Sequence, residues 1–126
     1  MKKLIEAACQ AQKNAHAPYS KYKVGAAVLT EDNNIITGCN VESSSYGLTC
    51  CAERTALYSA IAQGHNKFKE LAVITENGAS PCGACRQVIW DLCGEIPIYI
   101  ADSDGNIEKT TSKTLLPGAF DSNMLE

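Results

Sequence analysis

Cysteine is the residue type that most restricts what this chain can fold into, because it occurs seven times in 126 residues and is unevenly spaced. Cys50 and Cys51 are adjacent, and Cys82 and Cys85 enclose a Gly-Ala pair. An odd count without a recognisable export signal argues against a secreted disulfide framework. In a cytoplasmic protein, thiols serve in core packing, redox chemistry or metal binding, and their spacing has to distinguish these uses.

Charge and composition exclude several function classes. Eleven basic and fourteen acidic residues give a formal charge of -3, so we expect no nucleic-acid partner. A hydrophobic content of 45% is ordinary for a globular protein. Glu6, Gln10 and Gln12 interrupt the N-terminal apolar run, which predicts neither a signal peptide nor a membrane segment. We therefore expect a single domain, residues 1–126, in the cytoplasm and not at a membrane.

Hydrophobic periodicity predicts helices that alternate with strands. The expected elements are a helix with apolar positions from Leu4 to Ala15, strands over 24–30 and 35–41, a helix from Cys51 to Gly64, a strand over 71–75, a helix that follows Pro81 and closes at Gly94, a strand over 96–101, a brief strand near Ile107 and a helical turn over 114–116. This order is typical of a layered α/β domain with a partly parallel sheet. Ligands of such sheets bind where strands end and helices begin, and both cysteine clusters fall at predicted helix starts.

The spacing of the two clusters favours a catalytic metal site. Cys82 and Cys85 are three residues apart at a helix start, so their sulfurs lie on one side. Helix N-termini stabilise thiolates, and three thiolates, with Cys51 as the third, suit zinc. Three protein ligands leave one tetrahedral position open for water, whereas a structural zinc site fills all four. Glu53, two residues after Cys51, is placed to move protons without binding the metal, as in zinc deaminases.

Three thiolates around one Zn²⁺ carry a net charge of -1, which the surroundings have to offset. The two helix N-termini contribute to this. Arg54 and Arg86 each directly follow a cluster, so we expect them to donate hydrogen bonds to the thiolates.

The spacing alone leaves two other uses of these cysteines open. Cys50 would complete a closed four-cysteine structural site with Cys51, Cys82 and Cys85, although adjacent ligands point in divergent directions. The Cys82–Cys85 pair also resembles a thioredoxin-like redox motif, which would carry no stoichiometric zinc. The Cys51-Ala52-Glu53 segment argues against both.

The remaining cysteines and histidines are interpreted as structural. Cys9, Cys39 and Cys93 lie in helix or strand patterns and are expected to be inert core thiols. His16 and His65 stand in polar segments remote from the clusters and are expected on the surface.

Together these segments resemble the small homotetrameric zinc-dependent cytidine deaminases over nearly the whole chain. The matching blocks are residues 17–20 (APYS), 24–27 (VGAA), 38–42 (GCNVE), 51–56 (CAERTA), 81–87 (PCGACRQ) and 115–120 (LLPGAF). The resemblance implies hydrolytic deamination of cytidine and 2′-deoxycytidine to the uridines with release of ammonia, in pyrimidine salvage. It also implies one Zn²⁺ per chain, a homotetramer, and a three-layer α/β/α sandwich around a five-stranded mixed sheet.

The resemblance also implies a role for individual residues. Cys51, Cys82 and Cys85 would bind zinc, and Glu53 would move protons. The implied substrate contacts are Asn40 and Glu42 at the ribose 3′-hydroxyl, Tyr22 and Ala52 in the substrate site, and Phe120 and Tyr46 lent by neighbouring subunits. Ser43 departs from the Asn common at its position, and Cys50 is unusual beside a ligand.

Single residues distinguish related deaminases. Blasticidin-type enzymes share the zinc clusters but lack the Glu that corresponds to Glu42. Deaminases of nucleic acids typically have His in place of Cys51. The resemblance, together with the negative net charge, therefore favours a small nucleoside as substrate.

Overall fold

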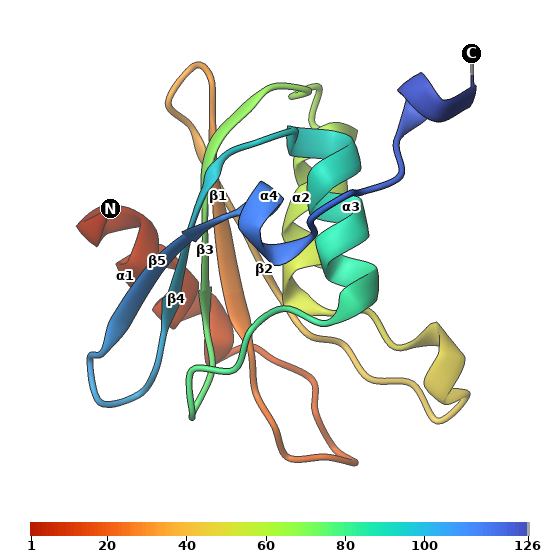
Figure 1. Ribbon diagram of the computed structural model, residues 1–126. Coiled ribbons are helices and arrows are strands. Elements are labelled where there is room, and N and C mark those ends of the chain that lie inside the picture. The colour runs from red at the N-terminus through yellow and green to blue at the C-terminus, as the bar shows by residue number, and fades with distance from the viewer. Residues whose placement is uncertain (126) are drawn as a thin grey trace.

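The computed structural model describes residues 1–125 and contains one five-stranded sheet with helices on both of its faces (Figure 1). In chain order the elements are α1 (Lys2–Gln12), β1 (Gly25–Thr30), β2 (Ile35–Cys39), η1 (Tyr46–Leu48), α2 (Ala52–Ala62), β3 (Phe68–Ile74), α3 (Gly83–Cys93), β4 (Pro97–Ala101), β5 (Ile107–Thr111), α4 (Ser112–Leu115) and η2 (Ser122–Leu125). Within these residues, the helices are too short or too polar to cross a lipid bilayer.

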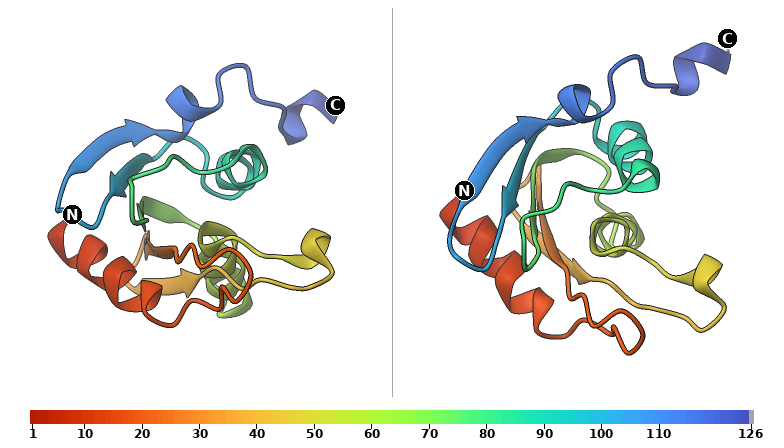
Figure 2. Two further views of the ribbon diagram at one scale, coloured as in Figure 1. Left: turned by 90° about the horizontal axis from the view of Figure 1, so that it is seen from below. Right: turned by 60° about the horizontal axis from the view of Figure 1, so that its bottom comes forward.

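The sheet is mixed, with the strand order β2-β1-β3-β4-β5. β3 and β4 are parallel and the other pairs are antiparallel. Parallel neighbours need a crossover connection, which α3 provides between β3 and β4. α1 covers one face of the sheet, and α2 and α3 cover the other (Figure 2). The three-layer α/β/α sandwich around a five-stranded mixed sheet is therefore confirmed.

The central strands are buried on both faces, because successive side chains of a strand point in opposite directions. On β3, Leu71 and Val73 belong to the core cluster that contains Ile89 of α3. Ala72 belongs to the other cluster, with Leu4 of α1. This is why the sequence of β3 ends in a continuous apolar run instead of alternating with polar residues.

Two glycines allow the helices to approach the sheet closely. A Cβ on Gly25 of β1 would lie 2.0 Å from the Ala8 carbonyl oxygen of α1. A Cβ on Gly38 of β2 would lie 2.4 Å from the Ala56 backbone nitrogen and 2.8 Å from the Ala52 carbonyl oxygen of α2. Since Ala52 begins α2, Gly38 sets the distance between the sheet and the first turn of that helix.

Several element boundaries differ from the sequence prediction, among them those of α1, β2 and β3. α1 ends at Gln12 instead of near Ala15, because the N–H groups that follow bond to carbonyls three residues back, as in a tight final turn. β2 ends at Cys39, and residue 41 forms isolated bridges only. β3 begins at Phe68 instead of residue 71, since exposed Lys69 interrupts the apolar pattern.

Candidate active site

Two helix N-termini bring three thiols together. Cys51 is the N-cap of α2 and Cys82 is the N-cap of α3, both with extended backbone. The Cys82 sulfur lies 3.8 Å from that of Cys51 and 3.3 Å from that of Cys85. The Cys85 backbone N–H also donates a hydrogen bond to the Cys82 sulfur at 3.5 Å, which caps α3. The structure thus assembles the three ligands that the sequence predicts.

The geometry of this cluster fits zinc. At a Zn–S distance of about 2.3 Å, two ligands of a tetrahedral site lie about 3.8 Å apart. Within residues 1–125, the group of possible metal ligands consists of Cys51, Cys82 and Cys85, whose sulfurs all lie within 4.8 Å of one another. Cys50 is not among them, and its backbone pairs with Val41 instead. The closed four-cysteine interpretation is therefore wrong, and three ligands leave one zinc position for water.

Arg54 supplies positive charge to the cluster. Its Nη2 donates hydrogen bonds to the Cys51 sulfur and to the Thr49 carbonyl, each at 3.5 Å. Hydrogen bonds from Cys85 and then from Arg54 lower the pKa of the Cys51 thiol to about 5. The hydrogen bond with Cys51, together with burial, raises the pKa of Cys85. Zinc therefore has to displace a proton from the cluster when it binds.

Arg86 does not take the role that the sequence predicts. Its Nε donates to the Pro81 carbonyl at 2.7 Å, and its Nη1 donates to the Leu115 carbonyl at 3.0 Å. The guanidinium is directed at these two carbonyls, so its hydrogen bonds go to the backbone and not to a thiolate. Arg86 thus supports the loop that leads into Cys82 and links it to α4.

Glu53 lies in the first turn of α2 and is only 3% exposed. It lines the same cavity as Cys51 and Cys82. Burial raises the pKa of its carboxyl group, and the charge of Cys51 raises it further. A buried carboxyl group with a raised pKa, in the same cavity as the thiols, is placed to accept and return a proton.

A cavity of about 260 Å³ extends from the cysteine cluster. The predicted site residues that line it are Tyr22, Asn40, Glu42, Cys51, Glu53 and Cys82. Ser20, Thr49 and Thr75 add hydroxyl groups to its wall. Sequence reasoning missed these three, because single Ser and Thr residues outside the metal motif carry no pattern of their own.

Asn40 and Glu42 are held in place by the segment that precedes β1. The Asn40 amide accepts a hydrogen bond from the Val24 N–H at 2.9 Å and donates one to the Tyr22 carbonyl at 2.8 Å. The Glu42 carboxylate accepts hydrogen bonds from the hydroxyl and the N–H of Ser20. The Ser20 hydroxyl is the largest cause of the lowered pKa of Glu42. Both side chains are therefore fixed at the cavity wall before a ligand arrives.

Tyr22 connects this wall to the loop before α3. Its hydroxyl donates a hydrogen bond to Asn77 Oδ1 at 2.6 Å, and the same oxygen accepts one from the Ala79 N–H at 3.3 Å. The loop that carries Asn77 and Ala79 leads to Cys82. Tyr22, on one wall of the cavity, is therefore hydrogen-bonded to the loop that leads to Cys82 on the metal-binding wall.

Three residues predicted to contact substrate do not line the cavity of their own described chain. Ala52 is fully buried as the first residue of α2, next to Gly38. Tyr46 is 73% exposed in η1, and its ring meets that of Tyr19 edge-on at 5.9 Å. Phe120 is 55% exposed in the C-terminal segment. η1, which carries Tyr46, and the C-terminal segment, which carries Phe120, both project away from the sandwich (Figure 1).

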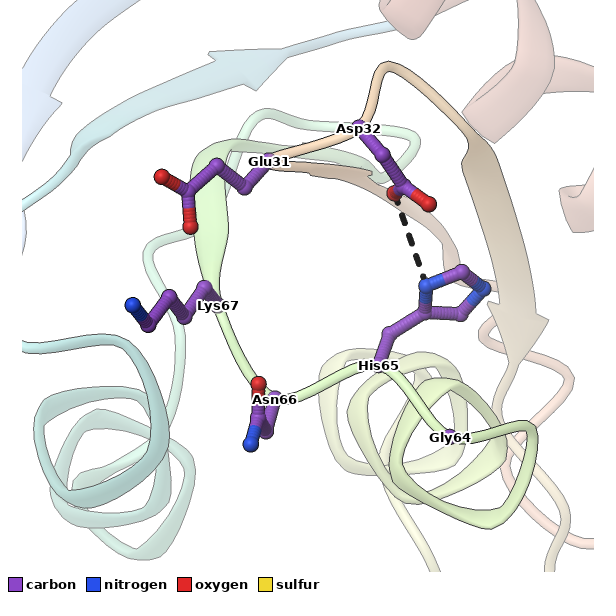
Figure 3. Close-up of a pocket in the computed structure, with 6 residues that line it drawn as sticks. All are labelled: Glu31, Asp32, Gly64, His65, Asn66 and Lys67. Carbon is purple, nitrogen blue, oxygen red and sulfur yellow. Dashed lines mark ion pairs between the residues drawn. The ribbon is translucent and has the colours of Figure 1, made fainter.

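A second hollow, of about 320 Å³, lies away from the cysteine cluster (Figure 3). Glu31 and Asp32 line it from the turn between β1 and β2, and His65 lines it from the connection between α2 and β3. His65 Nδ1 lies 3.5 Å from Asp32 Oδ1, and the His65 side chain is only 20% exposed. His65 is therefore partly buried at the surface hollow instead of fully exposed, whereas His16 is exposed as expected.

Cys9, Cys39 and Cys93 are half-buried and lie outside the metal cluster. Burial raises the pKa of Cys39 and raises that of Cys93 to about 12, so both thiols stay protonated. Cys9 packs at the edge of the core cluster beneath α1. Their half-buried positions agree with the expected core role.

Comparison with known proteins identifies the family. The family model for the cytidine and deoxycytidylate deaminase zinc-binding region matches residues 1–99. The chain belongs to this family. The cytidine deaminase of Sporosarcina psychrophila is 52% identical over 123 residues, which are 95% of this chain and 90% of that protein. The crystal structure of cytidine deaminase from Burkholderia pseudomallei matches with a TM-score of 0.91 at 47% identity, covering 94% of this chain and 98% of that one.

Family membership also resolves the remaining alternative for the cysteines. As a zinc-binding deaminase the chain is a hydrolytic enzyme, and the redox interpretation of Cys82 and Cys85 is wrong. A deaminase with another named substrate is also similar: blasticidin-S deaminase of Bacillus cereus is 30% identical over 114 residues, covering 82% of this chain and 81% of that protein.

Proposed function

We propose that this chain catalyses the hydrolytic deamination of cytidine and 2′-deoxycytidine to uridine and 2′-deoxyuridine, with release of ammonia. The observation that carries the proposal is the buried carboxyl of Glu53 in one cavity with the converging thiols of Cys51, Cys82 and Cys85. A zinc site with three protein ligands beside a carboxyl group that moves protons suits hydrolysis of an aminopyrimidine. Residues 1–126 act as a single catalytic domain.

Glu53 carries the protons of the reaction. A zinc ion held by Cys51, Cys82 and Cys85 would supply an activated water molecule. Glu53 accepts a proton from this water as the oxygen attacks C4 of the pyrimidine, and it delivers that proton to ring nitrogen N3. It then transfers the second water proton to the amino group, which leaves as ammonia when the C4–N bond breaks. The raised pKa of Glu53 suits both transfers, since the same group acts first as a base and then as an acid.

Asn40, Glu42 and Tyr22 hold the nucleoside. The lowered pKa of Glu42 keeps it charged at neutral pH, so it accepts a hydrogen bond from the ribose 3′-hydroxyl. The Asn40 amide has one N–H beyond its bond to Tyr22, and that group donates to the same hydroxyl. The Tyr22 ring packs against the pyrimidine. Ala52 does not line the cavity, so its contribution to substrate binding would come through the backbone at the start of α2, between Cys51 and Glu53.

Neighbouring copies of the chain complete the active site in a homotetramer. The cavity of a single chain, about 260 Å³, lies below the roughly 300–1,000 Å³ typical of small-molecule pockets. Tyr46 and Phe120 are aromatic rings exposed on projecting segments, and an adjacent subunit brings them over the cavity. The enzyme works in the cytoplasm, where it salvages pyrimidine nucleosides.

The test follows the ultraviolet absorbance of cytidine during incubation with the purified protein. We expect the cytidine band to disappear, and we expect the reaction to stop when a chelator removes zinc and to resume when zinc is restored. Protein with one zinc per chain that leaves cytidine unchanged would contradict the proposal. Blasticidin S is the comparison substrate. Preferential turnover of that compound would indicate that the chain is a blasticidin-S deaminase instead.

A further inference from the structure

Three side chains of α3 bind the C-terminal segment of the chain. Arg86 bonds the Leu115 carbonyl, as described above. Gln87 Nε2 donates a hydrogen bond to the Phe120 carbonyl at 2.7 Å. Trp90 Nε1 donates one to Asp121 Oδ2 at 3.1 Å. Figure 1 shows this segment running from α4 past α3 toward the C-terminus.

The segment depends on these contacts for its position. Residues 116–121 lie between α4 and η2, outside any helix or strand. Within the described chain, the backbone N–H groups of Phe120 and Asp121 donate to no other backbone carbonyl, and Pro117 has no N–H to donate. A chain terminus without such pairing is poorly ordered unless side chains tie it down. Gln87 and Trp90 are three residues apart, so they lie on one face of α3 and bind two consecutive residues, Phe120 and Asp121.

Asp121 is the central residue of this arrangement. One carboxylate oxygen accepts the Trp90 N–H, and the other accepts the backbone N–H of Asn123 at 2.9 Å. The carboxylate therefore anchors the segment to α3 and starts η2 at the same time. Hydrogen bonds to a charged acceptor are stronger than those between neutral groups. Phe120, directly before this anchor, is held with its ring exposed.

We propose that Gln87, Trp90 and Asp121 form a clamp that positions Phe120, and that they are positioning residues for substrate binding. The inference rests on the proposed function, in which the Phe120 ring covers the pyrimidine of a neighbouring subunit. If the C-terminal segment were disordered, covering a substrate with the Phe120 ring would cost conformational entropy each time. The clamp orders the segment beforehand, so it lowers KM and leaves kcat unchanged.

The test compares Asp121→Ala with Asp121→Asn, which keeps an acceptor oxygen for Trp90. We expect Asp121→Ala, which removes the hydrogen bonds to Trp90 and to Asn123, to raise KM for cytidine by at least about fivefold, the factor for one lost hydrogen bond, with an unchanged kcat. Asp121→Asn should restore most of the affinity. Trp90→Phe, which keeps the ring and loses the N–H, should resemble Asp121→Ala. Asp91→Ala, at an exposed position of the same helix, is the matched control and should leave KM unchanged.

Trp90 also reports on the clamp without any substrate, because it is the only tryptophan of the chain. In Asp121→Ala the indole should become more accessible to acrylamide quenching, and hydrogen exchange should accelerate at Asn123 and Met124, whose N–H groups bond to Asp121. In Asp121→Asn both should stay near the values of the unmodified protein. Circular dichroism and zinc content identify any variant that fails to fold.

A double-mutant cycle separates positioning from general stability. If the clamp acts through Phe120, Asp121→Ala should add no further increase in KM to a Phe120→Ala variant. Additive effects in this cycle, or a KM of Asp121→Ala equal to that of the active parent enzyme, would overturn the proposal. Failure of the proposed function would look different, since the unmodified protein would then not turn over cytidine.

Discussion

Replacing Gly38 with alanine tests whether the position of α2 relative to the sheet determines the deaminase activity. The added Cβ would lie 2.4 Å from the Ala56 nitrogen, whereas ordinary Cβ contacts begin at 3.4 Å. The obstructing atoms are backbone, so no side chain rotation relieves the overlap, and α2 has to move away by about 1 Å. Overpacking of this kind destabilises a protein by about 1–3 kcal/mol. A misplacement of about 1 Å at a catalytic site costs about 100-fold in rate.

Two other glycines provide matched controls. Gly25→Ala would place its Cβ 2.0 Å from α1, on the opposite face of the sheet, so it should reduce stability without displacing the metal site. A Cβ on Gly47 meets no atom within 4 Å, so Gly47→Ala should change neither the stability nor the activity. We would measure melting temperature by circular dichroism, zinc per chain, and kcat/KM for cytidine below the melting transition.

The expected result is a lower melting temperature for Gly38→Ala and Gly25→Ala, with a roughly 100-fold loss of kcat/KM in Gly38→Ala alone. Because Cys51 and Glu53 both lie at the start of α2, zinc retention should fall together with kcat/KM in that variant. A folded Gly38→Ala enzyme with the activity of the parent would refute the reasoning. An equal loss of activity in folded Gly25→Ala would also refute it, since the effect would then not depend on α2.

Three further predictions concern the site itself. Glu53→Gln should keep its zinc and lose about 10²–10⁴-fold in kcat, measured by cytidine absorbance, because the amide cannot carry protons. Arg54→Ala should bind zinc about 10–100-fold more weakly in chelator competition, because the thiolate of Cys51 loses its donor; unchanged zinc affinity would remove Arg54 from the site. KM should rise as the pH falls through the lowered pKa of Glu42, where the carboxylate becomes protonated, and in Ser20→Ala this rise should begin at a higher pH.

The metal centre is the part of the molecule that the sequence predicts best. Zinc needs particular ligand types at a close spacing, so Cys51, Cys82 and Cys85 had to occur in short motifs at helix starts. Glu53 could be predicted for the same reason, since it lies in the first turn of the helix that Cys51 caps. Local chemistry of this kind leaves a local pattern in the sequence.

Contacts between distant segments leave no such pattern. The close approach of Gly38 to α2 depends on how two elements pack, and a lone glycine in a strand carries no sign of it. Arg86 stands at a position as suggestive as that of Arg54, yet two carbonyls brought near it by the fold accept its hydrogen bonds. The hydrogen bond between Trp90 and Asp121 joins residues 31 positions apart, and the sequence gives no sign of it either.

The division of the zinc ligands between two helices also sets an order of events during folding. Cys82 and Cys85 are close in sequence, so an unfolded chain can already hold a metal ion between them. Cys51 joins only after the 30 residues between it and Cys82 have closed into a loop, which costs about 3 kcal/mol of chain entropy. Since that loop contains α2 and β3, the third thiol joins the other two only when these two elements have been brought together. A slow zinc-dependent phase in refolding, absent from a Cys51→Ala variant, would be the kinetic sign of this late closure.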